Sequence, residues 1–434
     1  MAFWKEEPQL HYALDLVESS EVFAVPVFMA EGYFTGRVVP RELGLDGCKT
    51  VRGGRRIHYC PPVGTDPRMA RIVLDRAAEV VSLPNEVRSK ATLVVLGHGT
   101  DRHPRSADTT LSLVGRLRKE CRYDRVVPAF LDQEPFLDRV LEDEVSANII
   151  VVPLFVSEGW HVGTTVPCEL ALKGETVKMQ GRRVWYAKPA GTHSSVAEVV
   201  RNLVEREKAN EPVKSESLEK RDRSVSPATA AKKAFISWIR AASGSPRVFL
   251  QTSVWSSESG RFEIRHERDR ATAAEALRSF YDPDEILAIA SMTAEGTYRP
   301  LKTAPDLTGG WRFAKLTEDE VWEVYARLYP AAPVHCYLQS QGRLPVVSFR
   351  EASKRQTGIY SAVGALRQVE VGALVEGCCS EERCLRNTTW STRGEVGQTA
   401  PPGLAVFGGV PCPAPCSVFF SHAASVLDPP QESR

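Results

Sequence analysis

The stretch Asn148–His161, with the sequence NIIVVPLFVSEGWH, decides how the rest of this chain is interpreted. Its apolar first half is too short to span a membrane and is typical of a strand buried on both faces of a parallel sheet. The strand leads into a loop that carries His161. An earlier apolar run, ATLVVL at 91–96, leads in the same way into Gly97-His98-Gly99-Thr100. A single loop histidine is usually an ordinary polar residue. Two histidines in matched positions after two strands predict a binding or catalytic site, because open α/β sheets bind ligands at the carboxyl ends of their strands.

The motifs LGHGT (96–100) and VVPLFVSEGWH (151–161) resemble the CbiX-type sirohydrochlorin cobaltochelatase family, which are class II chelatases. The resemblance implies a chelatase-like α/β fold and ATP-independent insertion of a divalent metal, Co²⁺ favoured, into a tetrapyrrole in cobalamin or siroheme biosynthesis. It also implies that His98 and His161 hold the metal. Two imidazoles with open coordination positions suit an ion that must be handed over, whereas a closed four-ligand cage would trap it.

Further site residues are expected around the two histidines. Glu158 can accept the pyrrole protons or orient His161. Three loop glycines would let the backbone approach the macrocycle, and four polar residues ahead of a helix would contact its carboxylates. The glycines are Gly97, Gly99 and Gly159, and the polar residues are Thr100, Arg102, Arg105 and Ser106.

Two alternatives remain open at this point. Imidazole ligands suit iron or nickel nearly as well, so a ferro- or nickel-chelatase of the same fold is the main rival. The other is a non-catalytic tetrapyrrole- or metal-binding redox protein.

Composition excludes several classes of protein. The chain has 434 residues, 43% of them hydrophobic and 25% charged, which is enough for several globular domains. A formal net charge of +1 gives no basic field for nucleic acid. The N-terminal residues lack the regions of a secretory signal, and no apolar run is long enough for a transmembrane helix. We therefore expect a cytoplasmic protein with no nucleic-acid or membrane partner and with reduced cysteines.

The N-terminal half contains a duplication. Residues recur at one constant spacing, as in the pairs Pro26 and Pro153, Gly32 and Gly159, and Phe34 and His161. The first copy therefore has a phenylalanine in place of the second histidine. The counterpart of His98 would precede Met1, so we expect the opening strand, loop and helix of this copy to be missing through a mis-assigned start or a truncation. The predicted domains are an incomplete first repeat at 1–85 and a second repeat at 86–205. Because strands and helices alternate in the second repeat, both repeats are expected to form doubly wound parallel sheets.

The middle of the chain carries fewer signals. Residues 206–233 are charged and almost free of apolar side chains, which predicts a solvated linker. Residues 234–333 predict a small α+β domain, including a helix from Thr272 to Tyr281. Arg299, Lys302 and Arg312 could meet an anionic ligand, although surface salt bridges are the favoured interpretation.

Most of the ten cysteines lie in the last predicted domain, 334–434. Four thiolates from two close groups suit either a [4Fe–4S] cluster or a structural zinc. The motifs RPLKTAP (299–305), RQTG (355–358) and PCPAPC (411–416) resemble a multidomain group of CbiX-like proteins. That resemblance implies a stabilising domain followed by a C-terminal [4Fe–4S] domain. The cluster could transfer electrons to a partner, sense metal or support the structure, and these roles remain open. The expected ligands are one of Cys378 and Cys379 together with Cys384, Cys412 and Cys416, with Cys336 in reserve.

Overall fold

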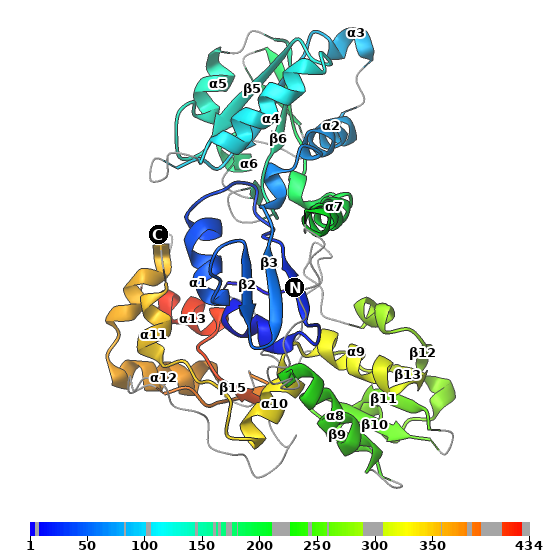
Figure 1. Cartoon of the computed structure of the whole chain (residues 1–434). Helices are drawn as coiled ribbons and strands as arrows, with labels where there is room; N and C mark the ends of the chain where they lie inside the picture. Colours follow the sequence, from blue (N-terminus) through cyan, green and yellow to red (C-terminus); the bar gives the residue numbers. More distant parts are fainter. Residues whose placement is uncertain are drawn as a thin grey trace, which may run out of the picture. The chain divides into compact units, whose positions relative to one another are not determined.

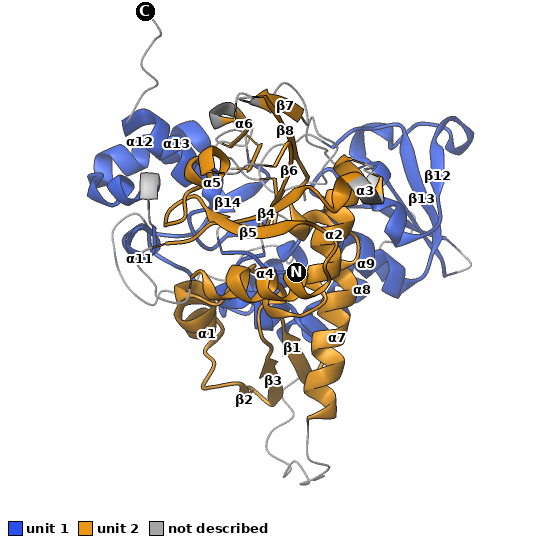
Figure 2. Cartoon of the chain, turned by 90° about the horizontal axis from the view of Figure 1, so that it is seen from above, with its two compact units in different colours: residues 1–18, 224–434 blue, residues 19–223 orange. Residues whose placement is uncertain are grey.

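The computed structural model describes residues 1–4, 8–81, 84–100, 106–143, 146–158, 162–163, 166–170, 176–179, 181–210, 226–241, 245–257, 260–289, 307–356, 358–379, 384–391 and 410–427. The chain forms two compact units (Figure 2). One comprises Met1–Glu18 and Ser224–Arg434, and the other comprises Ser19–Arg223. Every helix within the described ranges falls short of the length and hydropathy that a membrane span requires.

The second repeat forms a five-stranded sheet in the order β5-β4-β6-β8-β7 (Figure 1). Its neighbouring strands are parallel except for β7, which is antiparallel to β8. The parallel sheet is therefore confirmed, and the antiparallel edge strand is an addition that the sequence did not predict. The strands are β4 (Thr92–Gly97), β5 (Arg125–Phe130), β6 (Asn148–Pro153), β7 (Thr176–Met179) and β8 (Arg182–Tyr186).

Helices cover both faces of this sheet. Apolar side chains of α2 (Met69–Val80), α4 (Asp108–Lys119) and α7 (Val196–Ala209) form one core with β4 and β6. The other face packs against α5 (Leu137–Asp143) and α6 (Val166–Glu169). Because both faces are covered, β4 is buried along its whole length, as its uninterrupted apolar run predicts.

The first repeat reproduces part of the second. Its sheet has the order β1-β3-β2, with a parallel β1–β3 pair and an antiparallel β2–β3 pair, which matches β6-β8-β7. Each strand lies at the position that the constant sequence spacing gives it, so the duplication is confirmed. The strands are β1 (Glu21–Ala24), β2 (Lys49–Arg52) and β3 (Arg55–Tyr59). Helix α1 (Val39–Leu43) lies in the connection between β1 and β2.

The two repeats exchange their last helices, in the sense that the last helix of each repeat packs against a turn of the other repeat. Helix α2 contacts the turn η5 (Ala190–Thr192) of the second repeat, and α7 contacts the turn η3 (Val63–Thr65) of the first. Each contact carries an ion pair at equivalent positions, but the charges are reversed. Glu79 of α2 lies 3.4 Å from His193, whereas Arg206 of α7 lies 3.3 Å from Asp66.

The first eighteen residues pack apart from the rest of the predicted first repeat. The sequence assigned them to the first repeat, and their local turn does repeat: Phe3 N donates to Pro8 O at 2.8 Å, as Phe130 N does to Pro135 O at 2.9 Å. However, Met1–Glu18 groups with the unit that contains the C-terminal half of the chain. The 3₁₀ helix η1 (Leu10–Leu16) contacts helix α8, so tertiary packing separates this segment from its repeat.

The predicted linker at 206–233 is too long at both ends. Helix α7 continues to Ala209, and helix α8 runs from Pro227 to Arg240. The Ser226 side chain caps α8 by accepting from Thr229 N, and proline occupies its first turn. The charged composition masked these helix signals.

The predicted α+β domain contains a five-stranded sheet in the order β12-β13-β11-β10-β9. Helix α8 and helix α9 (Glu318–Leu328) share one core with this sheet. The helix expected from Thr272 to Tyr281 is wrong: this segment contains the short turn η7 (Ala274–Ala276) and β12. Pairing of β12 with β13 and burial of Phe280 override the local helix preference. The strands are β9 (Arg247–Phe249), β10 (Thr252–Ser256), β11 (Phe262–His266), β12 (Arg278–Phe280) and β13 (Trp311–Leu316).

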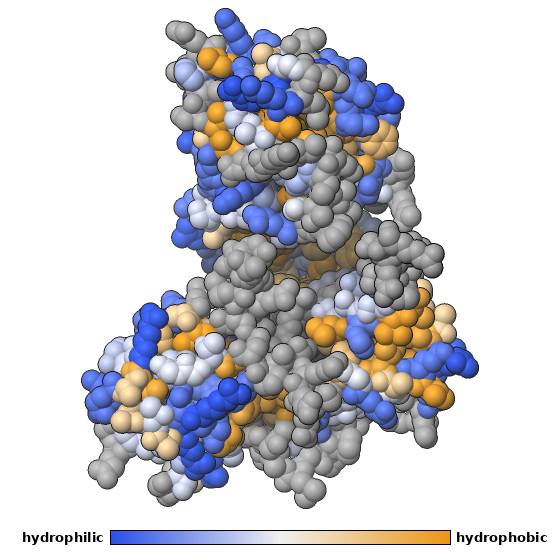
Figure 3. Space-filling view, turned by 180° about the vertical axis from the view of Figure 1, so that it is seen from behind, coloured by the Kyte–Doolittle hydropathy of each residue, from blue (hydrophilic) through white to orange (hydrophobic). Residues whose placement is uncertain are grey.

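The C-terminal region is mainly helical. It contains α10 (Ala332–Ser340), α11 (Phe349–Lys354), η9 (Gly358–Ala365), α12 (Gln368–Cys378) and α13 (Ser417–Leu427), with β14 (Arg386–Thr388) paired to β15 (Val410–Cys412). From α11 onward these elements enclose a separate core that includes Phe419. Figure 3 shows hydrophobic residues grouped over this region, at the lower right of that view.

Candidate active site

His98 lies directly after β4, at the carboxyl edge of the sheet. Its Nδ1 is 3.0 Å from the carbonyl oxygen of Gly99 and 3.3 Å from Asp132 Oδ2. Both neighbours are acceptors, so they favour the tautomer that carries a proton on Nδ1. The backbone N–H groups of Leu131 and Asp132 each donate to His98 O at 3.0 Å. The imidazole is therefore oriented by the loop after β5, in the tautomer that can bind a metal ion.

Gln133 holds the loop that follows His98. Its side-chain Oε1 accepts from Thr100 N at 2.8 Å and from Ser106 Oγ at 2.6 Å. Gly99 has a φ of +71°, and a Cβ there would lie 2.4 Å from Gln133 Cγ. A Cβ at Gly97 would lie 2.6 Å from a buried hydroxyl of α4. These glycines are thus required by packing inside the protein, a role that the sequence interpretation did not assign to them.

A cavity of about 1020 Å³ opens beside His98, lined by both repeats. Four aromatic rings form much of its wall. Phe28 and Phe34 stack with centroids 6.1 Å apart, and Tyr33 packs edge-on against Phe34 at 6.3 Å. On the other side, the Phe155 ring lies 6.0 Å from the His98 ring. The remaining lining residues are Met29, Ala30, Glu31, Gly32, Thr35, Gly97, Gly99, Thr100, Ser106, Thr110, Asp132, Leu154 and Val156.

The two loops with Phe28 and Phe155 are clamped in the same way. Gly64 N donates to Phe28 O at 2.9 Å, and Gly191 N donates to Phe155 O at 2.8 Å. A Cβ at Gly64 would lie 2.1 Å from the carbonyl oxygen of Met29, and one at Gly191 would lie 2.5 Å from Phe155 O. Each repeat therefore holds its cavity loop with the same glycine hydrogen bond and close backbone contact.

The structure places only part of the predicted site. His98, Gly97, Gly99, Thr100 and Ser106 all line the cavity. Glu158 is exposed and is not one of the described residues that line it. His161, Gly159, Arg102 and Arg105 lie outside the described residues.

Three described residues at or beside the cavity escaped the sequence interpretation. Asp132 lines the cavity and Gln133 lies next to it; both follow β5 and contact the loop that carries His98. Glu31 occupies the position in the first repeat that corresponds to Glu158, so the duplication was the signal that could have identified it.

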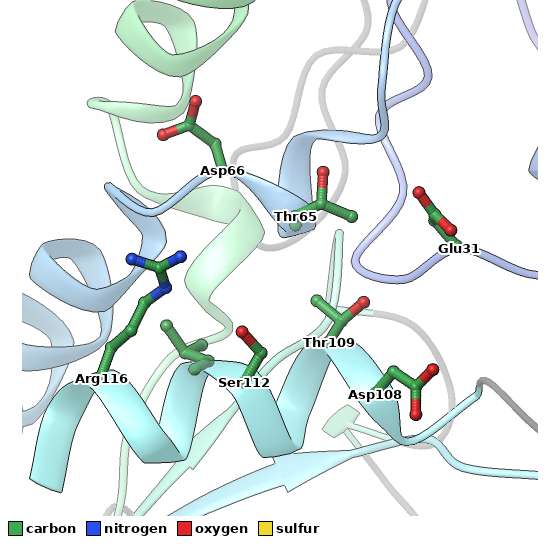
Figure 4. A pocket seen from close by; sticks show the side chains of 9 residues that line it. Glu31, Thr65, Asp66, Asp108, Thr109, Ser112 and Arg116 are labelled. Atoms are coloured by element: carbon green, nitrogen blue, oxygen red, sulfur yellow. The ribbon is translucent and has the colours of Figure 1, made fainter.

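A smaller polar pocket of about 200 Å³ shares Glu31 with the large cavity. Figure 4 shows Thr65 and Asp66 across the pocket from Thr109, Ser112 and the other residues of α4, with the Asp66 carboxylate pointing away from that helix. Asp66 is paired with Arg206. The pocket therefore lies between the turn η3 of the first repeat and helix α4 of the second.

Four of the predicted cluster cysteines lie near one another in the C-terminal region. The hydrogen bond between the Cys379 and Cys378 thiols, together with burial, raises the pKa of Cys379. Burial raises the pKa of Cys384 and of Cys416, and both thiols also interact electrostatically with Cys379. Cys412 is buried in the same core and donates to Ala414 O at 3.3 Å.

This donor set suits a cluster of soft metal ions. Buried thiols resist ionisation on their own, whereas bound iron favours the thiolate form. In the part of the chain that the structure describes, no three His, Cys, Asp or Glu side chains already stand in metal-binding geometry, so the thiols are gathered without being arranged as ligands. Cys336 belongs to the core of the sheet domain instead, where burial raises its pKa to about 12.

Comparisons with known proteins cover nearly the whole chain. Residues 1–80 and 92–207 match the CbiX family, residues 233–340 match the DR2241 stabilising domain, and residues 341–425 match a 4Fe-4S iron-sulfur cluster binding domain. The first repeat, its Met1–Glu18 segment included, thus belongs to the CbiX match even though that segment packs elsewhere.

Two curated relatives are similar in sequence. A probable sirohydrochlorin cobaltochelatase of Halobacterium salinarum is 34% identical over 223 residues, covering 46% of this chain and 76% of the relative. A sirohydrochlorin cobaltochelatase of Methanopyrus kandleri is 31% identical over 96 residues, covering 17% of this chain and 67% of the relative.

One solved structure is similar along nearly the full length. DR2241 from Deinococcus radiodurans, described as a multi-domain protein with structural similarity to chelatases and two additional domains, superposes with a TM-score of 0.72 at 26% identity. The match covers 98% of this chain and 89% of that chain. It confirms the expected chelatase-like α/β class with additional domains. The chain therefore belongs to the CbiX family of chelatases, in a multidomain form with a stabilising domain and a C-terminal 4Fe-4S domain.

Proposed function

We propose that this protein inserts a divalent metal, with Co²⁺ favoured, into a sirohydrochlorin-type tetrapyrrole, and that the reaction takes place without ATP in the cavity between the two repeats. The observation that carries the proposal is an oriented imidazole at the rim of a large, aromatic-walled cavity. One relative is named a sirohydrochlorin cobaltochelatase and the other a probable one, which supports cobalt as the metal and this class of macrocycle as the substrate.

The cavity suits both substrates. Its volume of about 1020 Å³ lies at the upper end of small-molecule sites, as a macrocycle requires. Phe28, Tyr33, Phe34 and Phe155 offer flat apolar surfaces for the faces of the ring system. The metal ion would bind His98 through Nε2, with His161 as the second proposed ligand. Few protein ligands hold the ion loosely, which favours its transfer to the four ring nitrogens.

Insertion releases two protons as two pyrrole N–H groups are replaced by bonds to the metal. A general base near the ring plane must accept them. Glu158 and the imidazoles are the candidates from the sequence, and the structure adds Glu31, which lines the cavity. Asp132 would act as a positioning residue, because its carboxylate lies 3.3 Å from Nδ1 of His98 and orients that imidazole.

The first repeat would supply a binding wall in place of a second metal site. Phe34 stands where the second repeat has His161, and its ring stacks on Phe28. We therefore expect Phe34→Ala to weaken binding of the metal-free macrocycle, measured by tetrapyrrole fluorescence, while KM for Co²⁺ stays unchanged.

The test is steady-state insertion of Co²⁺, Fe²⁺ and Ni²⁺ into sirohydrochlorin, followed by absorbance. His98→Ala and His161→Ala should abolish insertion while circular dichroism stays native. Asp132→Asn should retain reduced activity with a raised KM for the metal. The control is His193→Asn, which removes a nearby imidazole but keeps an acceptor for Ser195 N. Insertion that survives both histidine changes would refute the ligand assignment, and faster turnover with Fe²⁺ or Ni²⁺ would favour the rival metals.

The C-terminal thiols would hold a [4Fe–4S] cluster, which supplies electron-transfer or structural chemistry when bound. Either Cys378 or Cys379, with Cys384, Cys412 and Cys416, remains the proposed ligand set. A role outside metal insertion, with a separate electron-transfer partner, is consistent with its own domain match at residues 341–425. We also propose the cytoplasm as the location of the protein, where these thiols stay reduced.

A further inference from the structure

Among the described residues of the stabilising domain, helices α8 and α9 pack on one face of the sheet and leave the other face to a cavity. Residues alternate along its strands, and Phe262 and Ile264 point into the core with α8 and α9. Glu263 and Arg265 point to the opposite face. A second cavity, of about 700 Å³, lies over this opposite face. That volume is typical of sites for small molecules.

The centre of this cavity is cationic. Arg265 pairs with one oxygen of Glu263, and Arg312 pairs with the other oxygen at 3.1 Å, so two guanidinium groups share a single carboxylate. Arg261 and Lys315 also line the cavity. Glu263 is the one acidic residue among its described lining residues, which leaves a surplus of positive charge.

Aromatic rings stand at two sides of the cationic centre. Trp255 lies on β10, with the Arg265 guanidinium 5.1 Å from its ring centroid. Tyr281 follows β12, and the Lys315 amine lies 5.9 Å from its ring centroid. Strands β11 and β13 lie between these residues in the sheet order, so the two rings are separated by roughly 14 Å at ordinary strand spacing.

Lys315 occupies a backbone conformation that its residue type disfavours. Its φ is +61°, in the left-handed region that favours glycine. The pairing of β11 with β13 shifts at this point, between Phe262 and Ile264, as a bulge with an extra residue on β13 requires. A bulge redirects the bulged side chain, and such strain is typical of functional positions. Here it presents an exposed amine at the rim of the cavity.

We propose that this cavity is a second binding site, for a planar aromatic polycarboxylate of the same chemistry as the proposed substrate or its metal-loaded product. The ligand identity rests on the proposed function, whereas the site itself rests on the cations, the rings and the strained lysine. The ring system would lie between Trp255 and Tyr281, and its carboxylates would bind Lys315, Arg261 and the guanidinium groups that share Glu263. The stabilising domain would thereby hold a tetrapyrrole before or after metal insertion.

Lys315→Gly separates binding from folding. Glycine removes the amine and relieves the unfavourable φ, so the variant should melt at the same temperature as the wild type or higher. The matched control is Lys233→Ala, which removes one exposed lysine from helix α8 of the same domain. The probe is a metal-free octacarboxylate porphyrin titrated into the full-length protein, with tryptophan and porphyrin fluorescence as readouts.

We expect two porphyrin molecules per chain in the wild type and in Lys233→Ala. Lys315→Gly should weaken the second site by roughly tenfold, the loss expected for one charge-assisted hydrogen bond, and leave metal insertion at saturating substrate unchanged. Trp255→Leu should abolish the tryptophan quenching that accompanies the second binding event.

Two results would overturn the proposal. One is identical binding by Lys315→Gly and Lys233→Ala. The other is displacement of the second porphyrin by a nucleoside diphosphate at equal concentration, which would assign the site to phosphate. Failure of the proposed function gives a different result: the wild type would show no insertion, while the Lys315-dependent binding would still be measurable in wild type and in His98→Ala.

Discussion

The reversed ion pairs between the exchanged helices allow a quantitative test of the duplication. Asp66 accepts from Arg68 N at 2.9 Å and pairs with Arg206 at 3.3 Å. The equivalent His193 accepts from Ser195 N at 3.2 Å and pairs with Glu79 at 3.4 Å. Each residue therefore caps its own turn and binds the helix of the other repeat. Arg206→Glu would place a carboxylate against Asp66, whose side chain is only 3% exposed.

The size of the effect follows from the exposure of the two partners. At 3.3 Å the Coulomb energy is roughly 5 kcal/mol at an effective dielectric constant of about 20 and roughly 1 kcal/mol in bulk water. Arg206 is 62% exposed, so screening brings the attraction to about 1 kcal/mol. Reversing it to repulsion should cost about 2 kcal/mol, which lowers Tm by roughly 4–8 °C in a unit of this size.

The compensating variant makes the prediction specific. Asp66→His combined with Arg206→Glu reproduces the arrangement of Glu79 and His193, so it should recover most of the lost stability. Differential scanning calorimetry at about pH 6, where an ordinary imidazole is partly protonated, measures both changes as a double-mutant cycle. An unchanged Tm in Arg206→Glu, or a double variant no more stable than the sum of its parts, would refute the reasoning.

Three further predictions concern other parts of the chain. Burial lowers the pKa of His11 from 6.5 to about 4, so between these pH values the unfolded chain binds more protons than the folded chain. Lowering the pH from neutral to about 5 should therefore reduce the free energy of unfolding by about 2 kcal/mol. Urea unfolding of the wild type and of His11→Phe, which should lack this loss, measures the effect. Cys416→Ser should lower the iron content and the dithionite-sensitive absorbance near about 400 nm, whereas Cys121→Ser should change neither. Gly191→Ala would bring a Cβ within 2.5 Å of the cavity-loop backbone and should cost about 1–3 kcal/mol and weaken porphyrin binding, whereas Gly115→Ala, which meets open space, should not.

The elements that the sequence predicted well are those whose signal is local. The runs at 91–96 and 148–156 are apolar because β4 and β6 are covered on both faces, and this burial needs no knowledge of partners. The constant spacing between the repeats is matched in the structure, where β1, β2 and β3 lie at the positions equivalent to β6, β7 and β8. The antiparallel strand β7 was missed because an edge strand carries a weaker apolar pattern.

The errors arose where distant contacts decide the structure. The segment Thr272–Tyr281 contains helix-favouring alanines, yet pairing with β13 makes part of it a strand. Residues 1–18 repeat the sequence of 128–145 but pack in the other unit. Charged residues concealed the ends of α7 and α8, because the polar face of a helix resembles a linker when it is considered alone.

The site follows the same rule. His98 was found because it follows a buried strand, whereas Asp132 and Gln133 carry no motif and are recognised only by their hydrogen bonds to the neighbouring loop. The cationic cavity over the stabilising domain depends on a bulge at Lys315, which sequence patterns do not reveal.

Anomalous diffraction at the cobalt edge, from crystals of the full-length protein soaked with Co²⁺, tests the central claim most directly. The account predicts a cobalt peak in the cavity between the repeats, about 2.1 Å from His98 Nε2, and its loss in His98→Ala. A peak that persists in His98→Ala, or cobalt bound only outside this cavity, would contradict it.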